Sequence, residues 1–165
     1  MKRLIFIGGP MGIGKTTIGR ALVKNELANA VFLDGDWCWD LSPFIVNDEN
    51  KQMVVRNIQF LLNSFIENSK IENIVFVWVM HQQAIIDRIM AGLIDDYQFV
   101  SISLVATPEA LRKRFNKDVT KGIRENQAVS GAVARLPLYA AVNSQKIDVT
   151  NQTVFQTVAE IMKLL

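Results

Sequence analysis

The residues best suited to chemistry lie near the start of the chain, in the stretch Gly9-Pro10-Met11-Gly12-Ile13-Gly14-Lys15-Thr16-Thr17. This stretch fits the pattern G-x-x-x-x-G-K-[ST], in which a glycine-rich loop binds phosphate through its backbone N–H groups. Lys15 is expected to reach the β- and γ-phosphates as a mobile positive charge, and the Thr16 hydroxyl is expected to ligate Mg²⁺. The predicted nucleotide-binding positions are Gly9, Met11, Gly12, Ile13, Gly14, Lys15, Thr16 and Thr17.

Two aspartates form the next candidate group. Asp34 and Asp36 flank a glycine directly after the apolar run at residues 30–33. Ligands of an open parallel sheet bind at the carboxyl ends of its strands, so these carboxylates are expected to face the phosphates. Asp36 is the favoured proton acceptor for an attacking hydroxyl, and Asp34 is the predicted metal ligand and holds local backbone. The alternative is that one or both simply cap the turn or the next helix.

Three further residues are candidates for substrate binding. Trp37 offers an aromatic plane beside Asp36, although it and Trp39 equally suit a role as core anchors. Arg56, early in a predicted helix and off its apolar stripe, is either a ligand for an anionic group or a solvated side chain. His81, the chain's one histidine, either bonds a substrate oxygen or is structural.

The basic charge concentrates after residue 110. Residues 116–136 are polar, contain glycine and are weakly patterned, which indicates a lid that excludes water and brings arginine to the transferring phosphoryl group. Arg124, as a catalytic residue, or Arg135, at the substrate, would supply that charge, and Arg114 is expected to pack on the nucleotide base. An ordinary solvated loop is the alternative.

The elements that must position these residues alternate between strand and helix. The uninterrupted apolar run at residues 74–80, typical of a strand covered on both faces, predicts a strand at residues 71–80. Shorter stretches rich in apolar and β-branched residues predict strands at residues 2–8, 30–33, 99–105 and 146–150. Apolar residues at helical spacing predict helices at residues 15–28, 48–70, 83–93 and 154–165, and a further helix begins at Pro108 with Thr107 as its cap.

Composition narrows the class of protein. A chain of 165 residues, half of them hydrophobic, suits one folded domain covering residues 1–165. The net charge of +2 is too small to indicate nucleic-acid binding, and no stretch has the length of a membrane span. Cys38 is the one cysteine, which fits a reducing compartment, so we expect a cytoplasmic protein. We also expect a monomer or homodimer that acts on a small molecule.

One position departs from the usual pattern of phosphate-loop proteins. Many of them carry an acidic residue after the third predicted strand, where it orders water bound to Mg²⁺. This chain has Met80-His81-Gln82-Gln83 there. The departure assigns the metal to Asp34 or Asp36.

Taken together, these motifs resemble those of the small P-loop kinases related to nucleoside monophosphate, shikimate, gluconate and adenylylsulfate kinases. The resemblance rests on GGPMGIGKTT, LDGDW, VATPEALRKRF and the pair Arg135 and Tyr139. It implies a three-layer α/β/α sandwich with a five-stranded parallel sheet of order 2-3-1-4-5 and a short lid. In relatives, the aspartate matching Asp36 lies beside the acceptor hydroxyl, and the arginine matching Arg114 packs near adenine.

The sequence therefore predicts an ATP-dependent kinase that uses Mg²⁺ and transfers the γ-phosphoryl group to a hydroxyl or phosphate of a small molecule. Lys15, Asp36 and Arg124 are the predicted catalytic residues. A nucleoside triphosphate hydrolase and a non-catalytic nucleotide-binding module are the alternatives, because the acidic residue after Met80 is missing.

Overall fold

A parallel sheet forms the centre of the protein, whose computed structural model describes residues 1–165. The strands are β1 (Lys2–Gly8), β2 (Ala30–Asp34), β3 (Asn73–Trp78), β4 (Tyr97–Val105) and β5 (Gln145–Asp148). Their order is β2-β3-β1-β4-β5, and every neighbouring pair is parallel. The predicted fold class and strand order are confirmed.

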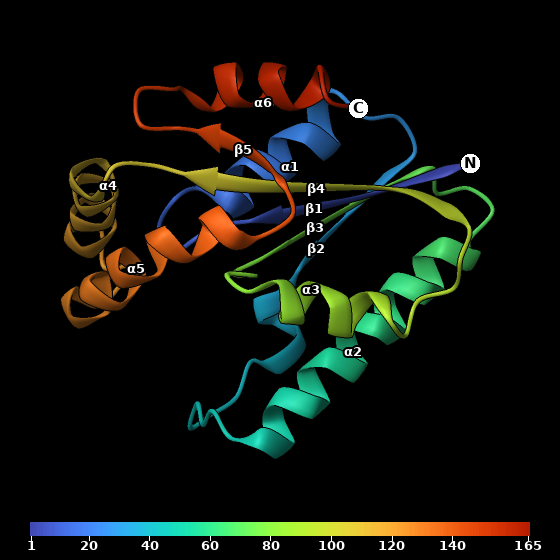
Figure 1. Ribbon diagram of the computed structural model, residues 1–165, viewed down its shortest axis with the longest axis horizontal. Coiled ribbons are helices and arrows are strands. Elements are labelled where there is room, and N and C mark those ends of the chain that lie inside the picture. Colours follow the sequence, from blue (N-terminus) through green and yellow to red (C-terminus); the bar gives the residue numbers. More distant parts are fainter.

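Helices cover both faces of this sheet (Figure 1). One face carries α1 (Lys15–Asn25) and α6 (Val154–Met162), and the other carries α2 (Asp48–Glu67) and α3 (Gln83–Met90). At the carboxyl end of the strands lie α4 (Pro108–Thr120) and α5 (Val129–Arg135). Three short 3₁₀ helices complete the chain: η1 (Gly35–Trp39), η2 (Asn126–Ala128) and η3 (Leu136–Ala141).

The central strand β1 supplies side chains to two separate cores. Ile5 and Ile7 pack with α1, α4 and α6 in one core, and Leu4 and Phe6 pack with α2 and α3 in the other. Successive side chains of a strand point to opposite faces, so a strand covered on both sides must be apolar throughout. This is why the apolar runs predicted buried strands correctly.

Predicted helix starts agree with the structure better than predicted helix ends. Thr107 caps α4 as expected, because its Oγ1 accepts a hydrogen bond from the N–H of Ala110 at 3.2 Å. The helix predicted for residues 15–28 ends earlier, at Asn25. Asn29 has a φ of 48°, in the left-handed region, and this turn leads the chain into β2.

The segment at residues 116–136 is more regular than its sequence suggested. Helix α4 runs on to Thr120, and α5 begins at Val129. Ala132 of α5 is buried, and Val129 and Val133 pack against the core that contains α1. This helical spacing of small apolar residues is present in the sequence and indicates the helix α5.

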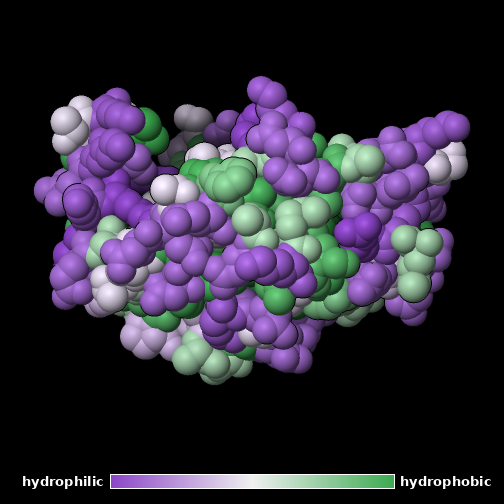
Figure 2. Space-filling model, turned by 90° about the horizontal axis from the view of Figure 1, so that it is seen from above, coloured by the Kyte–Doolittle hydropathy of each residue, from purple (hydrophilic) through white to green (hydrophobic).

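The surface seen from the side of α6 is mixed. Figure 2 shows apolar residues near the middle of this face and hydrophilic residues around them. None of the helices is both long enough and apolar enough to cross a lipid bilayer.

Tyr139 stabilises the carboxyl edge of the sheet. Its ring is fully buried, and its hydroxyl donates to the Val79 carbonyl at 2.5 Å. Burial raises the pKa of Tyr139, so the hydroxyl stays protonated and able to donate at neutral pH. The Val79 carbonyl also accepts from the backbone N–H of Gly9 at 3.2 Å. Replacing Tyr139 with phenylalanine removes one of these two hydrogen bonds and is expected to lower the free energy of unfolding by about 0.5–1.5 kcal/mol in urea denaturation.

The second tyrosine provides the control. Tyr97 is half-buried and its hydroxyl makes no hydrogen bond within the protein, so Tyr97→Phe should change the free energy of unfolding by less than about 0.5 kcal/mol. An equal loss in the two variants would show that the bond to Val79 contributes nothing specific.

Candidate active site

The glycine-rich loop connects β1 to α1 and has the backbone geometry of a phosphate site. Gly12 and Gly14 have φ values of 84° and 110°, which side chains with a Cβ rarely adopt. No side chain caps α1, so the first N–H groups of this helix are available to an anion. Ile13 is buried under the loop, whereas Met11 and Thr17 are exposed.

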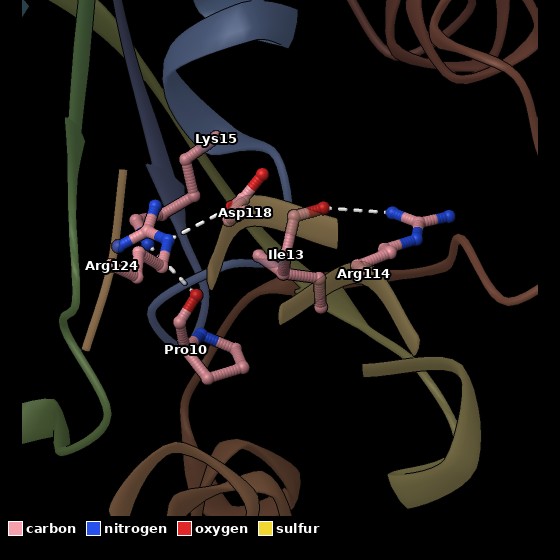
Figure 3. A network of polar contacts seen from close by, with 6 residues as sticks. All are labelled: Pro10, Ile13, Lys15, Arg114, Asp118 and Arg124. Carbon is pink, nitrogen blue, oxygen red and sulfur yellow. Dashed lines mark hydrogen bonds and ion pairs between the residues drawn. The ribbon is translucent and has the colours of Figure 1, made fainter. Parts of the chain in front are cut away.

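Lys15 lies across this loop. Its ammonium donates to the Pro10 carbonyl at 3.0 Å (Figure 3). Burial lowers the pKa of Lys15 to about 8, although Asp36 and Asp34 nearby act to raise it. Phosphate oxygens would stabilise the protonated form more strongly than a single carbonyl does.

Hydrogen bonds connect the loop to the two aspartates at the end of β2. The Thr16 hydroxyl donates to Oδ2 of Asp34 at 2.8 Å, and the backbone N–H of Asp36 donates to Oδ1 of Asp34 at 3.0 Å. Trp78 then donates from Nε1 to Oδ1 of Asp36 at 3.1 Å. Asp34 is buried and holds backbone, as expected, while Asp36 is exposed with its second oxygen free of hydrogen bonds within the protein.

The oxygens of Thr16 and Asp34 suit a magnesium ion. Mg²⁺ prefers oxygen ligands and in nucleotide sites takes the remainder from phosphates and water. The structure has no group of three or more His, Cys, Asp or Glu side chains that could hold a metal by themselves. A magnesium ion beside Thr16 would therefore depend on the nucleotide for most of its ligands.

Arg124 lies close to Lys15 and is held from α4. Its Nε donates to Oδ2 of Asp118 at 2.9 Å, and its guanidinium carbon lies 5.5 Å from the centre of the Phe115 ring. The side chains of Arg124 and Lys15 lie near one another (Figure 3). The positive charge of Arg124 acts to lower the pKa of Lys15. The segment at residues 116–136 thus places one arginine near Lys15, and its role as a lid stays a prediction.

Arg114 links the phosphate loop to the last strand. It donates from Nη1 to the Ile13 carbonyl at 2.8 Å and from Nη2 to the Val149 carbonyl, just after β5. An open cavity of about 320 Å³ lies beside this point, lined by Asp148, Thr150 and residues 151, 152 and 156. Arg114 therefore has a structural role in addition to any contact with a nucleotide base.

A larger cavity, of about 650 Å³, adjoins the phosphate loop at Met11. Its walls come from η1, the segment 40–47, α2, the end of β3 and α3, with Arg135 contributed by the end of α5. Asp36 lies on its wall. The cavity is large enough for a small organic molecule and places that molecule next to a free carboxylate oxygen.

His81 lies on the wall of the same cavity because the chain turns sharply before it. Met80 is buried with a φ of 41°, a strained conformation for a residue with a side chain. Burial and the charge of Arg135 lower the pKa of His81, so its ring is neutral at pH 7. Its Nδ1 is buried without a hydrogen-bond partner in the protein.

Two predicted substrate-binding residues, Trp37 and Arg56, do not line this cavity, and their role in substrate binding stays a prediction. Trp37 packs on Phe32 and Arg20, because successive residues of η1 point in different directions, and Asp36 and Trp39 are the residues of η1 that line the cavity. Arg56 faces solvent, since α2 turns Val54 and Val55 inward.

The structure also brings in residues that the sequence analysis did not single out. Trp78 and Arg88 both line the cavity. Trp78 lies within an uninterrupted apolar run, so the sequence indicates only a buried strand residue there, and Arg88 has the sequence pattern of an ordinary surface residue of its helix. Both meet Asp36 and Arg135 at the cavity, and no local sequence pattern indicates contacts between residues so far apart in the chain.

The sequence model of the AAA domain family matches residues 5–130, which include the phosphate loop, both aspartates and Arg124. The chain belongs to the AAA domain family. No curated protein matches it at a significant level.

Solved structures with the same fold as this AAA domain protein include several small kinases. A gluconokinase from Sinorhizobium meliloti superimposes with a TM-score of 0.71 at 16% identity, covering 96% of this chain and 89% of that one. A shikimate kinase from Acinetobacter baumannii, solved with shikimate, gives 0.63 at 23% identity, covering 99% and 92%. The tunicamycin resistance protein of Deinococcus radiodurans gives 0.71 at 18% identity, covering 99% and 95%. At these identities, the similarity establishes the P-loop kinase fold.

Proposed function

We propose that this AAA domain protein is an ATP-dependent kinase that phosphorylates a hydroxyl group of a small molecule. One observation carries the proposal: the cavity of about 650 Å³ borders the phosphate loop at Met11 and is lined by Asp36, whose Oδ2 makes no hydrogen bond within the protein. Hydrolysis of ATP would need only a water molecule beside the phosphate loop. A cavity of this size beside the loop supports an organic acceptor.

The residues of the site would divide the work of an in-line phosphoryl transfer. The acceptor oxygen bonds to the γ-phosphorus, the bond from that phosphorus to the bridging oxygen breaks, and ADP leaves. The proton of the hydroxyl passes to the free oxygen of Asp36. Lys15 and Arg124 bind the phosphoryl oxygens, where they stabilise the negative charge of the transition state.

Magnesium fits the oxygen atoms of Thr16 and Asp34 and would neutralise phosphate charge there. The nucleobase is proposed to lie near Arg114 and the cavity after β5. Both assignments were already predicted from the sequence.

The proposal is tested by measuring ADP formation from ATP with panels of nucleosides, sugars, hydroxy acids and antibiotics. The fold shared with the tunicamycin resistance protein is a reason to include antibiotics. At least one acceptor should increase the rate and yield a phosphorylated product. ATP hydrolysis that no acceptor changes would instead indicate a hydrolase, and thermal stabilisation by ATP without any product would indicate a binding module.

Nucleotide affinity should depend on pH through Lys15. The pKa of about 8 in the free protein should rise when phosphates surround the ammonium, so binding takes up a proton near pH 8–9. Affinity for ATP is therefore expected to be greatest below pH 8 and to fall as the pH rises above 8. Calorimetry in buffers with different ionisation enthalpies measures both the affinity and the proton uptake.

The matched variant for this experiment is Lys15→Arg. A guanidinium stays protonated throughout this range, so whatever affinity the variant retains should not fall between pH 8 and about 9.5. The same decline in both proteins would show that another group is responsible.

A further inference from the structure

We propose, on the basis of the proposed kinase function, that the acceptor is a flat, largely apolar alcohol that carries an anionic group. The composition of the cavity next to the phosphate loop leads to this substrate class. Its walls combine aromatic rings with arginine side chains that have no carboxylate partner.

The aromatic residues form a connected wall. The Trp39 ring lies edge-on to Phe44 at 5.0 Å between centres and to Trp78 at 5.8 Å. Most of the other side chains that line the cavity are also apolar, among them Val55 and Ile85. A polyol in this place would lose its hydrogen bonds to water without gaining enough partners, whereas a flat apolar body would bury its surface favourably.

The segment ahead of α2 exposes apolar side chains at the edge of this cavity. Phe44 and Val46, which both line it, are 57% and 55% exposed. Neighbouring exposed apolar residues in a loop are unusual unless they contact a ligand or partner. A ligand with an apolar body would cover them.

The charged residues of the cavity favour an anion. Lys51, Arg88 and Arg135 line it, and Asp36 is the single carboxylate among the lining residues. The two ion pairs of the chain are Lys51 with Asp48 and Arg124 with Asp118, so Arg88 and Arg135 have no acidic partner. Two unpaired guanidinium groups beside an apolar wall suit a carboxylate or phosphate on the ligand.

Binding can be tested without catalysis, because the chain has three tryptophans, of which Trp39 and Trp78 line the cavity and Trp37 does not. Their indole N–H signals in a ¹H–¹⁵N NMR spectrum, assigned with single Trp→Phe variants, report on the site. The probes are 6-(hydroxymethyl)-2-naphthoate, its neutral counterpart 2-naphthalenemethanol, and gluconate as an anionic polyol.

The naphthoate should shift the Trp39 and Trp78 signals, leave Trp37 unchanged, and bind about tenfold more tightly than either other probe. The double variant Arg88→Gln/Arg135→Gln should weaken naphthoate binding by about tenfold or more and change binding of the neutral alcohol little. Arg112→Gln, on the exposed side of α4, is the matched control and should bind like the unmodified protein.

Three results would overturn the proposal: gluconate binding as tightly as the naphthoate, the neutral alcohol binding as tightly as the acid, or no probe shifting Trp39 and Trp78. A parallel assay of ADP formation separates this inference from the kinase function. Turnover with polyols alone would leave the kinase function standing and reject the acceptor class. Selective naphthoate binding in a protein that phosphorylates no acceptor would support the ligand class and contradict the kinase.

Discussion

Replacing Lys15 with alanine is expected to reduce the rate of ATP turnover by about a thousandfold. The ammonium of Lys15 lies over the phosphate loop, and no other lysine replaces it there, since the neighbouring cation is Arg124. The variant loses the charge that binds the β- and γ-phosphates as negative charge develops during transfer. Initial rates of ADP formation at saturating ATP measure the effect.

The variant should fold normally, because alanine favours helix formation. The substitution also removes an ammonium group whose charged form is disfavoured by burial, as its lowered pKa shows. Circular dichroism and thermal unfolding at pH 7 check this. Lys24→Ala, in the exposed last turn of the same helix, should keep the full rate. A near-native rate in Lys15→Ala would reject the phosphate site and with it the kinase proposal.

Replacing Asp36 with asparagine is expected to separate nucleotide binding from phosphoryl transfer. The amide oxygen of asparagine can still accept the hydrogen bond from Trp78 Nε1, but the side chain can no longer take a proton from the acceptor. The transfer rate should fall about 10²–10⁴-fold, the range that general base catalysis contributes. The affinity for ATP should change less than about threefold, because Asp36 does not contact the loop directly.

Two measurements make this prediction specific. Isothermal calorimetry gives ATP affinity, and product formation gives the transfer rate with the acceptor found by screening. The companion variant Asp34→Asn affects the carboxylate bonded to Thr16 and should weaken binding of ATP with Mg²⁺. If Asp36→Asn instead lost affinity and rate equally, Asp36 would be a metal ligand or a structural residue.

The parts of the protein predicted correctly have local causes. Apolar runs predicted the central strands because the part of a strand that is buried on both faces must be apolar, as residues 4–7 of β1 and 74–77 of β3 are. The glycine-rich loop was recognisable because its backbone requires glycine where φ is positive, at Gly12 and Gly14. Asp34 was placed by its position at the end of a predicted strand, and the structure bonds it to Thr16.

The ends of elements and the helices within residues 116–136 were predicted less well. A helix ends where tertiary contacts or a turn stop it, and α1 ends at Asn25, ahead of the left-handed turn at Asn29, although alanine and lysine nearby favour helix. In residues 116–136, polar and charged residues outnumber the few small apolar ones that anchor α5, such as Ala132. The pattern was therefore too weak for a sequence-based assignment.

The sequence by itself determined the phosphate loop, the parallel sheet and the edge of the sheet where the site lies. Each of these depends on residues that are adjacent in the chain or on the periodicity of one strand or helix. Only the tertiary structure decided which aromatic and basic side chains share the cavity: Trp39 rather than Trp37, and Arg88 rather than Arg56. The turn of η1 and the packing of α2 against α3 set these directions. Such contacts join segments far apart in sequence and leave no periodic signal in either one.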